Sequence, residues 1–281
     1  LVPAFKMKFW NLGAQGQVLI GGLCSAACMF YIQDKLPSGV LIVIMLVAAV
    51  LGSMLWAFIP AFFKAHWNTN ESLFTLMMNY IAIQLVGFAI ASWVTSGSGV
   101  MGLINQNSEC GWLPSVFGQK YFINVAVVVL ATIGMYIYLR YTKQGYEISV
   151  VGGSVNTARY IGIDVKKVII RTMLISGAMC GLAGFLLVSG TNHTISSTIE
   201  DGMGFTAILV SWLATFNPIV MVLTSFLIVF LQRGSSEIAM TFRLNESVAD
   251  ILTGIILFFI IGCEFFINYK IAFNKKKSEE N

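Results

Sequence analysis

The sequence predicts an all-α, polytopic integral membrane protein. Of its 281 residues, 57% are hydrophobic and only 11% are charged, and the mean hydropathy is +0.80. Soluble domains carry about 25% charged residues. Charge-free runs such as 38–63 and 72–108 exceed the length of about 20 residues that crosses a bilayer core. Short alternating strands are absent, so we expect helical spans, each satisfying its own backbone hydrogen bonds.

About eight membrane helices follow from these runs. The apolar run 202–232 is broken at Asn217-Pro218, where proline removes a backbone donor and restricts the residue before it. Two shorter helices, 203–216 and 218–232, are therefore expected, either as two crossings or as one re-entrant hairpin. The six longer helices are expected at about 14–32, 39–62, 72–94, 122–140, 165–190 and 248–268.

Basic residues give the orientation. In an alternating topology, segments 1–13, 63–71, 140–171 and 269–281 lie on one side and hold 13 of the 17 Lys and Arg residues. The positive-inside rule makes this side cytoplasmic. The net charge of +4 is small and the basic residues cluster beside spans, which argues against nucleic acid as a partner.

The polar segment 140–171 has a clear local design. Ser154 is a suitable N-cap for a short helix, Gly162 a suitable stop, and Asp164 can cap the membrane helix that follows. The pattern leaves two interpretations open: a helix lying on the lipid surface, or a helix held in a cleft of another subunit. The expected apolar side of this helix consists of Val155, Ala158 and Ile161.

The sequence lacks the residues that several classes of chemistry require. The spans hold almost no ionisable side chains, which disfavours ion coupling through such groups, although backbone carbonyls could still bind Na⁺. No phosphate-binding loop ending in Lys-Ser/Thr occurs, and Gly152-Gly153 is interpreted as a turn, so we expect no ATP hydrolysis and no bound cofactor in this chain. His66 and His193 are isolated, so no metal site is expected.

Two further patterns concern packing and polarity. Gly177, Gly181 and Gly184 fall on nearly one helix face, which favours close helix packing over a ligand role. Polar side chains also occur at or just inside span ends, where they could bond a polar solute, neighbouring helices or water. These side chains are Asn11, Gln15, Gln17, Asn70, Glu71 and Asn79.

Four blocks in order resemble one family. Residues 145–164 resemble the cytoplasmic motif of bacterial ABC importer permeases of the ribose and nucleoside type, in the nucleoside/simple-sugar branch. Residues 11–17, 56–80, and 202–205 followed by Asn217-Pro218 are similar to three other blocks of that family. Gln15 stands where the family has Glu, and about two helices precede the first block there, so we expect an N-terminally truncated chain.

The resemblance implies a single transmembrane permease domain over 1–281, with a coupling loop at about 141–167 and a basic cytoplasmic tail at about 269–281. It implies a multi-pass protein of the bacterial inner membrane that moves nucleosides or simple sugars inward by alternating access. Its partners would be a second permease subunit, identical or different, ATPase subunits that bind ATP and Mg, and an extracytoplasmic substrate-binding protein. A monosaccharide or another small polar solute is the alternative within this class, and a secondary transporter, a channel or a non-transporting scaffold are alternatives outside it.

Specific residues carry these expectations. The six polar residues at span ends are assigned to the substrate pathway, a weaker assignment resting on motif match and polarity. The residues that match the coupling motif are assigned to ATPase contact and are Gly145, Glu147, Gly152, Asn156, Ala158, Arg159, Gly162 and Asp164.

Overall fold

The computed structural model describes residues 1–32, 36–94, 101–116 and 118–245, with a few residues between 247 and 263. Regular structure in this part is helical, apart from one isolated β-bridge between Val116 and Gln119. In chain order the helices are α1 (Val2–Lys6), α2 (Ala14–Ile32), α3 (Ser38–Trp67), α4 (Glu71–Trp93), α5 (Phe122–Tyr141), α6 (Lys143–Gly153), α7 (Val155–Tyr160), α8 (Val165–Phe185), the π-helix η1 (Leu186–Asn192), α9 (Met203–Leu213) and α10 (Pro218–Thr241).

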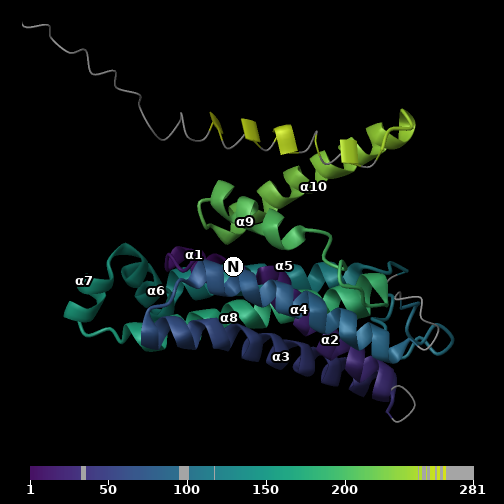
Figure 1. The fold of residues 1–281 in the computed structure, drawn as a ribbon, viewed down its shortest axis with the longest axis horizontal. Helices are drawn as coiled ribbons and strands as arrows, with labels where there is room; N and C mark the ends of the chain where they lie inside the picture. Colours follow the sequence, from purple (N-terminus) through teal and green to yellow (C-terminus); the bar gives the residue numbers. More distant parts are fainter. Residues whose placement is uncertain are drawn as a thin grey trace, which may run out of the picture.

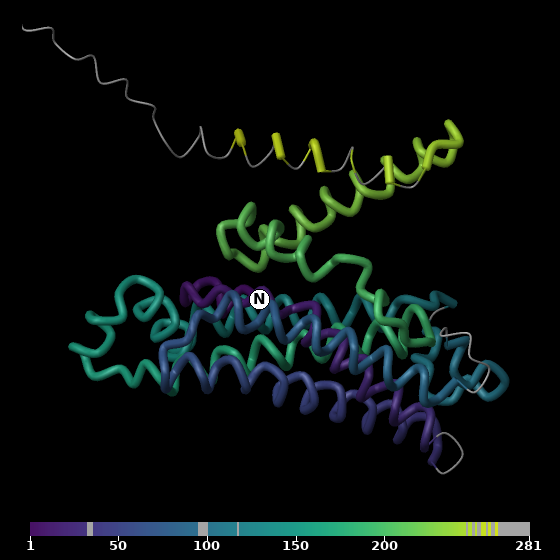
Figure 2. The backbone as a smooth tube through the Cα atoms, viewed as in Figure 1, coloured from purple at the N-terminus to yellow at the C-terminus, as the bar shows by residue number. Residues whose placement is uncertain are grey.

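Six stretches of the described residues are long and apolar enough to cross a membrane: α2, α3, α4, α5, α8 continued by η1, and α10. This confirms the predicted all-α, multi-pass fold. Helices α2, α3, α4 and α8 pack side by side, while α6 and α7 extend past one end of this bundle (Figure 1). The loop 101–116 lies at the opposite end (Figure 2). The segment 140–171 and the loop 101–116 are thus at opposite ends of the bundle, as the alternating topology requires.

The helices around Asn217-Pro218 differ from expectation in length. Helix α9 has 11 residues, about 16 Å of helix, and is too short to span a bilayer core. Helix α10 ends at Thr241 rather than near 232, and its 24 residues are long enough to cross. A charge marks the edge of an apolar run but does not break a helix, so Arg233 and Glu237 lie within α10. The helix expected at 248–268 falls largely outside the described residues.

Small residues bring α8 against α2 and α3. A Cβ at Gly177 would lie 2.6 Å from Ala57 Cβ, and one at Gly181 would lie 2.9 Å from Val50 Cα. A Cβ at Gly184 would lie 2.6 Å from the backbone N of Gly22. These approaches are closer than carbon atoms normally allow, so only glycine fits. The predicted close-packing role of this glycine face is confirmed.

One hydrophobic core cluster lies between α2, α3, α4 and α8, and a second core cluster lies at the end that carries α6 and α7. The short helix α1 is buried there, with Ala4 fully covered, and packs against α6 and α8. Ile148 and Val151 of α6 belong to the same cluster as Met173 of α8. The segment that projects from the bundle is therefore anchored through its own apolar base.

Candidate functional site

Helix α6 begins at a tight turn after α5. The Thr142 side chain accepts a hydrogen bond from the Gly145 N–H at 3.1 Å. A Cβ at Gly145 would lie 2.6 Å from the carbonyl oxygen of Tyr138, so the turn closes around this glycine. Glycine here lets α6 fold back against the last turn of α5.

The turn expected at Gly152-Gly153 is wrong, because both glycines lie in the last turn of α6. The chain turns one residue later, at Ser154, whose backbone is extended. A Cβ at Gly152 would overlap the carbonyl oxygen of Lys6, whereas a Cβ at Gly153 would meet nothing within 4 Å. A side chain is excluded at Gly152 because α6 packs against the backbone at the end of α1, a contact distant in sequence.

The three signals around α7 are confirmed. The Ser154 hydroxyl accepts from the Thr157 N–H at 3.3 Å. Gly162 adopts φ +83°, a left-handed conformation that glycine reaches without steric cost. Asp164 accepts from the Lys167 N–H at 3.3 Å and caps α8. This backbone hydrogen bond, together with the Lys167 side chain, lowers the pKa of the Asp164 carboxyl below its ordinary value.

The expected apolar side of α7 is only partly buried. Ala158 is fully covered and belongs to the second core cluster. Val155 is 42% exposed and Ile161 51% exposed, while Tyr160 is 93% exposed. A helix of six residues has room for one such anchor, so the period-three pattern overestimates its burial. Helix α7 is thus held by one small side chain and presents apolar and aromatic groups to its surroundings.

An ion pair joins α6 to α8. Arg171 Nη2 donates to Glu147 Oε2 at 2.8 Å, and both side chains are largely covered. Arg171 lies in the second turn of α8, so the pair neutralises a charge at the start of a membrane span. It also ties the base of the projecting segment to the helix that packs against α2 and α3.

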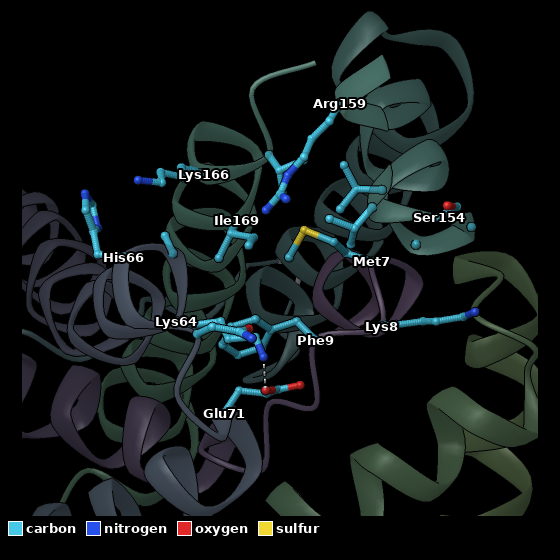
Figure 3. A pocket seen from close by; sticks show the side chains of 17 residues that line it. Met7, Lys8, Phe9, Lys64, His66, Glu71, Ser154, Arg159, Lys166 and Ile169 are labelled. Carbon is cyan, nitrogen blue, oxygen red and sulfur yellow. Dashed lines mark ion pairs between the residues drawn. The ribbon is translucent and has the colours of Figure 1, made fainter. Parts of the chain in front are cut away.

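A cavity of about 580 Å³ opens between this segment and the bundle end (Figure 3). We call it the basic cavity. Residues 7–9, the end of α3, the ends of α6 and α7, and the start of α8 line it. Lys64 and Glu71 form an ion pair of 2.7 Å in its wall. Arg159 reaches into it from α7. The charged or basic side chains of the lining are Lys8, Lys64, His66, Glu71, Arg159 and Lys166.

Three of the polar residues assigned to a substrate pathway are brought together. Asn11, Gln17 and Asn79 are buried, and the side-chain amides of Asn11 and Gln17 lie 3.4 Å apart. Asn79 accepts from the Gly16 N–H at 2.8 Å and donates to the Leu12 carbonyl at 2.7 Å. This network joins the start of α2 to α4.

The other three lie elsewhere. Asn70 caps α4 by accepting from the Ser72 and Leu73 N–H groups, and Glu71 pairs with Lys64. Gln15 is half-buried, and a Cβ at Gly204 would lie 3.0 Å from the Gln15 Cβ. The six residues therefore do not line one common cavity.

Sequence reasoning missed Glu200. Its side chain is buried and accepts from the N–H groups of Gly202 and Gly204, at 3.2 and 2.8 Å. It caps the start of α9, which packs against the start of α2 through Gly204. An acidic residue just before a predicted helix start is a capping signal that the sequence offered.

The described residues contain no group of three or more His, Cys, Asp or Glu side chains that could hold a metal ion. At the end that carries α6 and α7, the described residues offer basic side chains, ion pairs and an exposed apolar helix.

The chain is similar to a known protein family and to several named proteins. Residues 4–261 match the family described as branched-chain amino acid transport system / permease component. The chain is 29% identical to the guanosine ABC transporter permease protein of Bacillus subtilis, covering 98% of this chain and 79% of that protein. It is 26% identical to the glucose ABC transporter permease protein of Haloferax volcanii, covering 98% and 75%.

A nucleoside ABC transporter permease protein of Lactococcus lactis is 26% identical over 92% of this chain and 73% of its own length. No solved structure matches the chain.

Proposed function

Because the chain belongs to the permease-component family of branched-chain amino acid transport systems, we propose that it is the membrane-spanning subunit of an ATP-driven importer for nucleosides or related simple sugars. The observation that carries this is the family match over residues 4–261, combined with relatives named for guanosine and nucleoside transport. The relative named for glucose favours a monosaccharide as the alternative solute.

Helix α7 is the site of ATPase docking in this proposal. Its outward-facing side chains form the contact, with Asn156 from the family motif beside Val155, Tyr160 and Ile161. Arg159 of the motif lies on the side of α7 that faces the basic cavity, at the edge of this contact. Apolar and aromatic groups exposed beside polar ones are typical of a protein-binding surface. The remaining motif residues shape and anchor the segment: Gly145, Glu147, Gly152, Ala158, Gly162 and Asp164.

The substrate pathway is proposed near the start of α2. There the buried network of Asn11, Gln17 and Asn79 meets the start of α9 through Gln15. Buried amides held by backbone hydrogen bonds offer fixed polar groups to a nucleoside or sugar. Glu71 lines the basic cavity and Asn70 caps the same helix end, and both are proposed to act at the inner end of the pathway.

The assembly proposed around this chain has a second permease subunit, ATPase subunits that carry ATP and Mg, and an extracytoplasmic substrate-binding protein. It lies in a bacterial cell membrane, with α6 and α7 on the cytoplasmic side, where the basic residues gather. Energy then enters through the ATPase rather than through ionisable groups in the spans.

The test is uptake into proteoliposomes that hold the whole complex, with ATP on the ATPase side. We expect uptake of radiolabelled guanosine or glucose that depends on ATP and on the binding protein. An ATPase variant that cannot hydrolyse ATP is the control and should abolish uptake. ATP-independent flux through the permease alone would contradict the proposal and favour a channel or secondary transporter.

The docking surface has its own test. Tyr160→Ala removes a 93% exposed ring from α7 and should weaken co-purification of the ATPase. Tyr141→Ala removes a 69% exposed ring at the end of α5 and serves as the matched control. Equal retention of the ATPase by both variants would show that the docking surface does not lie on α7.

A further inference from the structure

The basic cavity holds an excess of positive charge that its own ion pair does not balance. Four cationic side chains and one carboxylate line it, a formal net charge of +3 with His66 neutral. Lys64 is paired with Glu71. The ion pairs formed among the described residues include neither Arg159 nor Lys166. Such an arrangement favours an anion between the walls.

Among the described residues, Arg159 is the unpaired cation that enters this space, because it reaches from α7 toward the bundle (Figure 3). Lys166 and His66 lie along one rim, and the exposed Lys166 ammonium points away from Arg159. Lys8 points away from the centre and contributes through its charge alone. Apolar groups complete the lining, with Phe9 buried and Ile169 half-buried. The cavity therefore combines cationic donors with an apolar wall.

The end of α3 indicates the level in the membrane at which the basic cavity lies. One side of α3 is exposed and apolar over its whole length, and it ends in aromatic rings. Phe63 and Trp67 contact each other, and Trp67 is 62% exposed, directly beside Lys64 and His66 of the lining. Tryptophan on a membrane helix marks the headgroup level. The cavity thus lies where the phosphates of the adjacent leaflet lie.

We propose that the basic cavity binds the phosphate of an anionic phospholipid, held by Arg159 of α7 and by the exposed Lys166 side chain of α8 turned inward from the rim. Basic pockets between membrane helices on the cytoplasmic side are suited to such headgroups. Because α7 and α8 supply opposite walls, the lipid bridges the projecting segment to the bundle. The proposed lipid site depends on the cavity and on its level in the membrane, and not on which solute the protein carries.

The experiment is native mass spectrometry of the purified chain equilibrated with phosphatidylglycerol and phosphatidylethanolamine of identical acyl chains. We expect retention of phosphatidylglycerol in preference to phosphatidylethanolamine. Arg159→Gln and Lys166→Gln should each weaken that binding about fivefold, the effect of one basic residue near a membrane surface. Arg159→Lys keeps the charge and should retain most of the binding.

Lys167→Gln is the matched control. Lys167 is the next residue on the same turn of α8, exposed like Lys166, but it lines a different pocket and pairs with Asp164. It should leave phosphatidylglycerol binding unchanged. Equal retention of the two lipids, or equal loss in the Lys166 and Lys167 variants, would overturn the proposal. Displacement of the lipid by millimolar inorganic phosphate would assign the cavity to a soluble anion instead.

Discussion

Gly152 offers the sharpest test of how the projecting segment is attached to the bundle. A Cβ at this position would overlap the carbonyl oxygen of Lys6 and lie 3.1 Å from its carbonyl carbon and 3.2 Å from Met7 Cα. Carbon atoms pack best at about 3.5–4.0 Å. All three neighbours are backbone atoms, so no side chain can turn aside. Gly152→Ala must therefore move α6 away from the end of α1.

The magnitude follows from a comparison with Gly153. Forcing a methyl group into a packed site costs about 1–3 kcal/mol. Alanine gains up to about 1 kcal/mol over glycine from helix propensity, and both glycines lie in the last turn of α6. A Cβ at Gly153 meets nothing within 4 Å. The difference in free energy of unfolding between the two alanine variants is therefore the packing cost, about 1–3 kcal/mol.

The assay measures thermal unfolding of the purified chain and ATP-driven uptake by the reconstituted complex. Gly152→Ala should lower Tm by about 2–4 °C for each kcal/mol lost, and uptake should fall because α7 is displaced. Gly153→Ala should leave both near the parent values. If the two variants behave alike in Tm and in uptake, the close approach of α6 to Lys6 does not position the segment.

Three other outcomes are expected. Glu147→Gln leaves Arg171 without its ion pair and should destabilise the chain by about 1.5–3 kcal/mol in thermal unfolding, with partial recovery when both charges are exchanged. Gly181→Val should lower Tm by several degrees, whereas Gly134→Val, where nothing lies within 4 Å, should not; equal shifts would contradict the packing of α8 on α3. Burial lowers the pKa of His193, so the folded chain binds fewer protons than the unfolded chain, and stability should fall as pH drops through about 6.5. Hydrogen exchange in loop 101–116, where the Ile104 N–H donates to the His193 carbonyl, should report this fall. His193→Phe should remove the pH dependence.

Local signals were predictable where the partner of a residue is close in sequence. Ser154, Gly162 and Asp164 act within three or four residues of themselves, and all three roles are confirmed. The glycine face of α8 was also predictable, because small residues at helical spacing have few uses in a membrane other than close packing. The spans followed from apolar length alone.

Features that depend on distant contacts were not predictable. The need for glycine at 152 comes from Lys6, far away in sequence, and nothing in the local pattern distinguishes this glycine from one in a turn. The exposure of Val155 and Ile161 depends on how far α7 projects, which a period-three pattern does not encode. The basic cavity gathers residues from the segments 7–9, 64–71, 151–159 and 165–169, so in the sequence their charges look like an ordinary positive-inside bias.

The attachment of α6 and α7 bears on how a force applied at α7 would reach the spans. The projecting segment meets the bundle through Gly152 against Lys6, Glu147 with Arg171, and Ile148, Val151 and Ala158 in the second core cluster. The first two contacts are a close backbone approach and an ion pair. Both lead to α1 and α8, and α8 is locked against α2 and α3 by glycines that leave no free space. A displacement of α7 is therefore expected to move α8 as a unit rather than to deform the segment. If the ATPase docks on α7 as proposed, weakening one attachment should reduce uptake more than it reduces docking, since the proposed contact uses only the exposed side of α7.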